Sequence, residues 1–181
     1  AVDDAPVMWA ETHGALARSL SLSGQRARQL PTLREAVEAY RAALSAARDE
    51  LPTSLRIELQ TGIGATLLEM AEYDKSTDVL DAAAAAYTAA LTLLSRAESP
   101  DAWADASLNL GSALLALSDT NRDPRHLKGA VEALSGALEV LSIERNLEAW
   151  TTATVALADA LAALAEAEAP SADRLRVAIA T

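Results

Sequence analysis

Hydrophobic residues recur along the chain at spacings of three and four, which is the period of an amphipathic helix. Two such runs, residues 103–117 and 127–141, are separated by a polar stretch over residues 118–125. Asp123 and Pro124 in this stretch are typical of a helix start, because Asp caps a first turn and Pro fits its first position. The pattern therefore predicts two helices, A and B, joined by a short turn.

The same helix-turn-helix pattern returns every 47 residues. The matching positions form the columns Trp9, Arg56, Trp103 and Trp150; Ala17, Gly64, Gly111 and Ala158; Leu20, Leu67, Leu114 and Leu161; Leu33, Leu80 and Leu127; Tyr40, Tyr87 and Leu134; and Ala43, Ala90 and Ala137. We therefore predict one all-α domain over residues 1–181, an α-solenoid with repeats at 6–52, 53–99, 100–146 and 147–181, the last of them incomplete. The phase of the columns disfavours the alternative, an ordinary bundle of Ala-rich helices.

Glycines at two positions of the small-residue column predict close contact between helices. Gly64 and Gly111 fall inside helical patterns, where glycine costs roughly 1 kcal/mol against alanine. Ala17 and Ala158 fill the same position where slightly more room is expected. Further helix breaks are predicted over residues 24–31, 51–53, 73–78, 98–101 and 169–173.

Composition narrows the functional classes. Of the 181 residues, 51% are hydrophobic and only 3% aromatic, which suits close-packed helices and argues against disorder. The net charge is −11 and the only lysines are Lys75 and Lys128, so nucleic acid and anionic membranes are not expected partners. The longest apolar stretch, residues 82–94, is shorter than the roughly 20 residues that span a bilayer, so no transmembrane helix is expected.

No residue pattern indicates catalysis, a metal or a cofactor. The chain has no cysteine, and its two histidines, His13 and His126, lie in different repeats without metal-ligand partners at helical spacing. Gly62 and Gly64 sit within a helical pattern, so they are not a phosphate-binding loop. We expect a protein that is not an enzyme, although a spatial Ser-His-Asp arrangement is not excluded by spacing alone.

Three segments resemble the tetratricopeptide (TPR) repeat family. Residues 109–114 match the Leu-Gly and large apolar pattern of its helix A, while residues 36–44 and 130–138 match the alanine pattern of its helix B. The resemblance covers essentially the whole chain, but the period is 47 residues and both helices are therefore longer than in the family. The chain is also similar to the long Trp-Ala-containing repeats of tandem arrays in bacterial proteins.

The resemblance implies a right-handed superhelix whose concave face, lined by the A helices, holds a peptide or a partner protein without catalysis. Transferred by column, the partner-binding positions are Glu11, Arg18, Glu58, Thr61, Glu69, Asp105, Leu108, Ser112 and Asp159. The Asn column of family members that grip a terminal carboxylate reads Ala15, Gly62, Asn109 and Ala156, so that mode is not expected. A basic or amphipathic ligand suits the acidic groove better, the alternative being that these carboxylates only solvate an exposed face.

The two ends of the chain predict self-association. Residues 174–180 read as the start of a fourth helix B, and neither end carries a polar capping helix. We interpret the sequence as a piece excised from a longer protein, with end-to-end pairing of copies as the alternative. A regulatory region of a larger signalling protein also fits, and a cytoplasmic location is favoured although the lack of cysteine leaves the compartment open.

Overall fold

The computed structural model describes residues 5–46 and 50–169, and within them the chain forms seven α-helices and no strand. The prediction of an all-α protein is therefore confirmed for this part of the chain. The helices are α1 (Pro6–Ala27), α2 (Leu30–Ala46), α3 (Thr53–Ala71), α4 (Thr77–Leu91), α5 (Pro100–Asn121), α6 (Pro124–Leu138) and α7 (Leu147–Glu168). The predicted helix over residues 174–180 lies outside the described residues.

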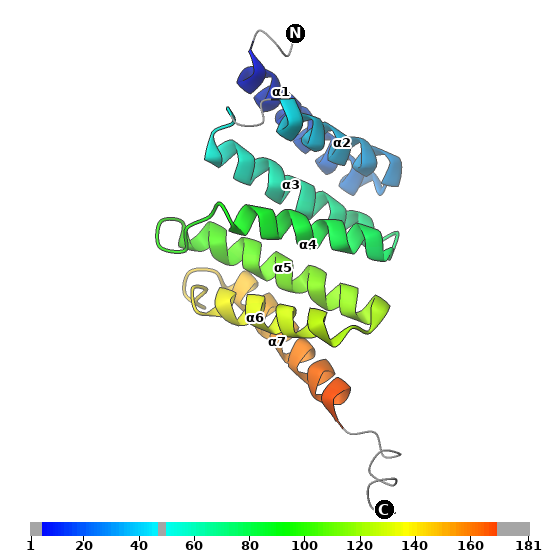
Figure 1. Cartoon of the computed structure of the whole chain (residues 1–181), viewed down its shortest axis with the longest axis vertical. Helices are drawn as coiled ribbons and strands as arrows, with labels where there is room; N and C mark the ends of the chain where they lie inside the picture. The colour runs from blue at the N-terminus through cyan, green and yellow to red at the C-terminus, as the bar shows by residue number, and fades with distance from the viewer. Residues whose placement is uncertain (1–4, 47–49, 170–181) are drawn as a thin grey trace, which may run out of the picture.

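The helices follow one another in a row, with α1 and α7 at opposite ends (Figure 1). The most extensive contacts join α1 to α2, α3 to α4 and α5 to α6, and each of these pairs also packs against the next helix along the chain. Smaller contacts link α1 to α3, α3 to α5 and α5 to α7. We call these four the A helices, and α2, α4 and α6 the B helices; the A helices thus adjoin one another along one side of the row.

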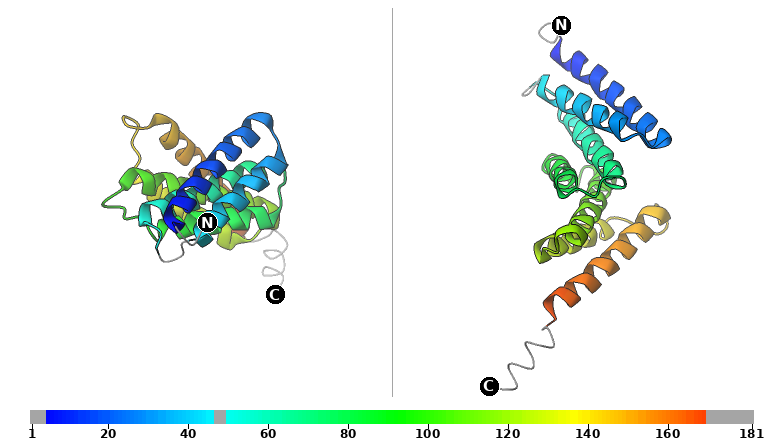
Figure 2. Two further views of the ribbon diagram at one scale, coloured as in Figure 1. Left: turned by 90° about the horizontal axis from the view of Figure 1, so that it is seen from above. Right: turned by 90° about the vertical axis from the view of Figure 1, so that its right-hand side faces the viewer.

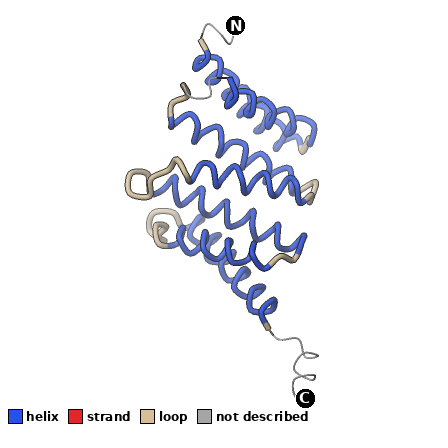
Figure 3. The backbone as a smooth tube through the Cα atoms, in the orientation of Figure 1, coloured by secondary structure: helices blue, strands red, loops and turns tan. Residues whose placement is uncertain are grey.

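Helix starts recur with the period of the sequence. The A helices begin at residues 6, 53, 100 and 147, and the B helices at 30, 77 and 124, so each start is displaced by 47 residues from the last. Two side chains cap helices at these starts: Asp123 accepts from the backbone N–H of Arg125, and Asn146 from that of Ala149. Turns gather at the two edges of the row, where consecutive helices reverse direction (Figures 2 and 3).

Some helix ends differ from the predicted breaks. Helix α1 continues through Gly24 to Ala27, and α5 continues to Asn121, so both run about a turn further than the polar residues indicated. Both helices end instead at an arginine in the left-handed conformation, Arg28 and Arg122, whose backbone N–H bonds back to the last turn. Arginine adopts this conformation at a cost in strain, so neither helix ends at the glycine that usually occupies such a position. Gly24, which lies in a predicted break, is instead part of α1.

Close helix contact at the small-residue column is confirmed. A Cβ atom added at Gly64 would lie 2.6 Å from the ring of Tyr87, and one at Gly111 would lie 2.4 Å from Leu134. In each case an A helix approaches the B helix of the same repeat so closely that only a glycine fits. Ala17, in the same column, is fully buried.

The outer face of α7 is more exposed than the equivalent faces inside the row. Leu161 is 48% exposed whereas its counterpart Leu67 is 4% exposed, and Val155 is 56% exposed whereas Leu108 is 8% exposed. Helix α7 is also long and apolar enough to cross a membrane, so the expectation of no such segment is not confirmed. Length and composition alone are weak indications of a membrane span.

Candidate binding surface

A cavity of about 430 Å³ opens on the side of the row where the A helices adjoin. Its walls come from α1, α3 and α5, and the side chains of Tyr40 and Tyr87 reach it from the B helices α2 and α4. Four of the nine predicted partner-binding residues line it, and they come from three different repeats: Arg18, Glu58, Thr61 and Asp105. Stacking of the A helices therefore brings these residues together.

Arg18 and Glu58 form an ion pair across the junction of α1 and α3. Their side chains are about half exposed, 53% and 47%, so the pair lies at the rim of the cavity rather than inside it. A pair of this exposure adds little to folding stability, typically below about 1 kcal/mol. Its main effect is to occupy the carboxylate of Glu58 with a cation from the same chain.

Asp105 is the next carboxylate along this side, and it has no such cation. No Arg, Lys or His of the described residues lies within 4 Å of it; Arg145, its basic neighbour, pairs with Asp101 at 3.4 Å. Partial desolvation, reinforced by the negative charge of Asp101, raises the pKa of the Asp105 carboxyl above its usual range. The surface thus holds one neutralised carboxylate and one uncompensated carboxylate.

Tyr40 and Tyr87, which share one column of the repeat, also line the cavity, although the sequence did not mark them as binding residues. Both rings are buried, and burial raises the pKa of both hydroxyls, so both remain protonated at neutral pH. Neither hydroxyl has a hydrogen bond within the described part of the chain, and neither is a buried unsatisfied group, so each hydroxyl oxygen keeps some contact with solvent. Gly62, where a Cβ would lie 2.5 Å from the Tyr40 ring, is the sequence signal that could have revealed this approach.

No family model, curated protein or solved structure matches the chain. The surface is therefore interpreted from its own geometry and from the comparison of its repeats.

A second cavity, of about 570 Å³, lies further along α3 and α5. Ser112, another predicted residue, lines it together with Glu72, Lys75 and Asp119. The Ser112 hydroxyl donates a hydrogen bond to the carbonyl of Leu108 at 3.0 Å, which leaves its lone pairs available. This cavity, like the first, is lined by charges of both signs.

The remaining predicted residues are not brought into the first cavity. Glu69 accepts hydrogen bonds from the Gln25 amide at 3.0 Å and the Tyr73 hydroxyl at 3.4 Å, so it is already engaged within the chain. Glu11 and Asp159 are exposed on α1 and α7. Leu108 lies in the hydrophobic core, so little of its side chain is available to a partner.

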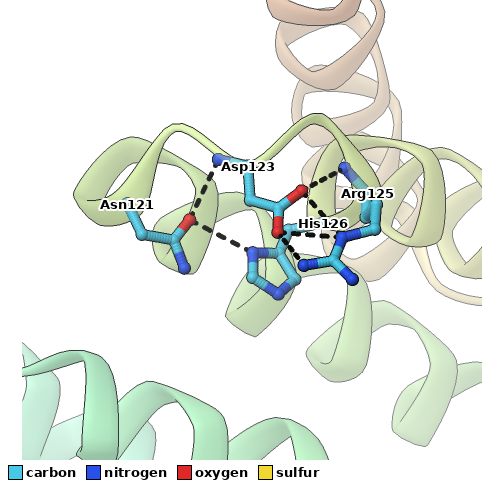
Figure 4. Close-up of polar contacts among 4 residues, drawn as sticks. All are labelled: Asn121, Asp123, Arg125 and His126. Carbon is cyan, nitrogen blue, oxygen red and sulfur yellow. Dashed lines mark hydrogen bonds and ion pairs between the residues drawn. The ribbon is translucent and has the colours of Figure 1, made fainter.

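The two histidines take part in local structure. The His13 ring stacks on Trp9 with centroids 3.5 Å apart, and its Nδ1 lies 3.0 Å from the Trp9 carbonyl oxygen. Nδ1 of His126 lies 3.2 Å from the side-chain oxygen of Asn121, at the turn between α5 and α6 (Figure 4). Within residues 5–46 and 50–169, no three His, Asp or Glu side chains are grouped as a metal site would require.

The same turn holds a second carboxyl with a shifted pKa, that of Asp123. Asp123 accepts hydrogen bonds from the Arg125 guanidinium at 2.6–3.1 Å and from the Arg125 backbone N–H at 2.9 Å (Figure 4). These bonds lower the pKa of Asp123 to about 2. Because Asp123 is the N-cap of α6, this perturbation has a structural cause and needs no functional one.

Proposed function

We propose that the chain is a non-enzymatic, TPR-like α-solenoid that holds a peptide segment of a partner protein on its A-helix side. The observation that carries the proposal is the cavity formed jointly by α1, α3 and α5, which exists only because successive repeats stack. An extended or helical peptide lying along the A helices would meet side chains from several repeats at once. The row of helix pairs would, on this proposal, follow a right-handed superhelix with the cavity on its concave side.

The charge of this side favours a basic or amphipathic peptide. Of the nine predicted partner-binding residues, Glu11, Glu58, Glu69, Asp105 and Asp159 are acidic and only Arg18 is basic. The cavity also has apolar walls, including Ile57, Leu94 and Ala106. Complementary charge would steer a basic peptide to the surface, and apolar contacts would hold it there.

Charge reversal tests the proposal. A variant with Glu58, Asp105 and Asp159 all replaced by lysine should bind fluorescent 12-residue peptides rich in Arg and Leu at least tenfold more weakly than the unchanged chain, as measured by anisotropy. The matched control reverses three exposed carboxylates elsewhere, Glu35, Asp81 and Glu144, and should retain binding at the same ionic strength. Equal loss in both variants, or no loss in the first, would reject the A-helix side as the binding surface.

A second candidate function, self-assembly through the ends of the row, is favoured by where the apolar exposure lies. Among the described residues, six of the eight large exposed hydrophobic side chains are on the two end helices: Met8, Leu16, Leu22, Leu147, Val155 and Leu161. Light scattering across a concentration series should then show association that Val155→Glu with Leu161→Glu abolishes. A particle that stays monomeric at high concentration would reject assembly without affecting the peptide-binding proposal.

A further inference from the structure

Two equivalent positions in consecutive repeats differ in how their carboxylates are neutralised. Arg18 on α1 pairs with Glu58 on α3, which lies 40 residues further along the chain. The same step in the next repeat leads from Ala65 to Asp105. The carboxylate is kept but the arginine is replaced by a methyl group, and both residues line the same cavity.

The surroundings of Asp105 suit a cation that comes from outside the chain. Asp105 is exposed at the cavity and no described cation pairs with its carboxylate, while Arg145 pairs with Asp101. Ala65 leaves open the space that an arginine stem occupies at the equivalent position of the preceding repeat. The chain therefore shows, at Arg18 and Glu58, how a guanidinium binds in this setting.

We propose that the cavity beside Asp105 receives an arginine side chain of the partner peptide, whose guanidinium binds the Asp105 carboxylate over Ala65. This inference rests on the proposed function and specifies which residue the peptide must supply. It places one arginine at a fixed point of the surface, so that the rest of the peptide takes its register from that contact.

The distribution of acceptors favours arginine over lysine. Besides Asp105, the residues Tyr40, Tyr87 and Asn109 line the cavity, so side chains that carry hydrogen-bond acceptors come from several helices around it. A guanidinium offers five N–H donors in a planar fork and can satisfy several acceptors at once, whereas an ammonium is a compact point charge. Arginine is also more weakly hydrated than lysine, which lowers the cost of binding beside the apolar walls of the cavity.

The test compares two peptides that differ in one heavy atom of one side chain. A fluorescent 12-residue peptide of Leu, Ala and Ser with a single arginine should bind roughly tenfold or more tightly than the same peptide with citrulline, which keeps the shape but loses the charge. Ala65→Arg should abolish this preference, because the new arginine occupies Asp105 as Arg18 occupies Glu58. Asp105→Asn should abolish it as well. The matched control, Ala85→Arg, adds the same side chain at an exposed position of the B helix α4 and should leave the preference intact.

The outcomes separate this inference from the proposed function. Peptides that bind, and are weakened by charge reversal of the A-helix side, but show equal affinity for arginine and citrulline would overturn the arginine site alone. A preference that survives Ala65→Arg would overturn it too. Failure of every peptide to bind the unchanged chain would instead reject the proposed function. Circular dichroism of each variant establishes that the helices are retained, and Ala65→Gln separates the effect of charge from that of bulk.

Discussion

The second and third repeats pack their helices alike and differ in charge. In both, a glycine of the A helix lies against a large side chain of the B helix, Gly64 under Tyr87 and Gly111 under Leu134. In the second repeat the carboxylate of Glu58 is paired, whereas in the third the carboxylate of Asp105 is not. Because the buried columns give the two repeats the same helix arrangement, surface residues at equivalent positions can be compared directly.

The largest expected effect concerns the shared packing. Gly64→Val and Gly111→Val should each lower the free energy of unfolding by about 1–3 kcal/mol, because the added atoms overlap Tyr87 and Leu134. Urea denaturation followed by circular dichroism would measure it. Ala158→Val is the control, since this member of the same column is exposed on α7, and a change within about 0.5 kcal/mol is expected. Equal losses at all three positions would contradict the packing account.

A smaller effect, on peptide affinity, should follow when Glu58 loses its internal cation and so resembles Asp105. Arg18→Ala removes the internal cation from Glu58 and should raise the affinity for the arginine peptide roughly twofold, because a second carboxylate then competes for the guanidinium. Stability should fall by less than about 1 kcal/mol, given how exposed the pair is. Titration by anisotropy gives the affinity, and Arg34→Ala, which removes an exposed arginine of α2, is the control. Weaker peptide binding after Arg18→Ala would instead show that the Arg18 side chain contacts the peptide.

The smallest expected effect concerns the starts of the B helices. Asp123 caps α6 through its side chain, whereas Ser76 at the equivalent position before α4 makes no such bond. The folded pKa of Asp123, about 2, lies below the ordinary value of about 3.9, so its stabilisation is full above about pH 4 and is lost as the pH falls through 2. Asp123→Asn should therefore lower the melting temperature at pH 7 more than at pH 2, with Ser76→Ala nearly neutral at both. A melting temperature of Asp123→Asn that differs from the unchanged chain equally at both pH values would refute this.

The helices and their close contacts could be predicted from the sequence because they follow from local periodicity. The column of Gly64 and Gly111 predicted the tight approach, since glycine inside a helix is unfavourable unless space demands it. The helix ends could not be predicted as well. Helix α5 continues through Asp119 to Asn121, because a polar residue can lie within a helix as well as cap the next one. Arg28 and Arg122 end their helices in a conformation that glycine usually adopts.

The surface was predicted only in part, because it depends on how repeats stack. Column transfer placed Arg18, Glu58, Thr61 and Asp105 on one side, and the structure joins them in one cavity. The pairing of Arg18 with Glu58 spans 40 residues and two repeats, so no local pattern contains it. Leu108 belongs to the same face by its spacing, yet it lies in the hydrophobic cluster formed by α5, α6 and α7 and is 8% exposed.

The most direct measurement is the titration of the Asp105 carboxyl by carbon NMR, with and without the arginine peptide. We expect the pKa of Asp105 in the free chain to lie above the usual Asp range, because of desolvation and the charge of Asp101. It should fall clearly when the arginine peptide binds, because a bound guanidinium stabilises the carboxylate. The citrulline peptide should leave the pKa raised. If the pKa of Asp105 is unchanged by either peptide, the binding of a partner arginine to the Asp105 carboxylate is contradicted.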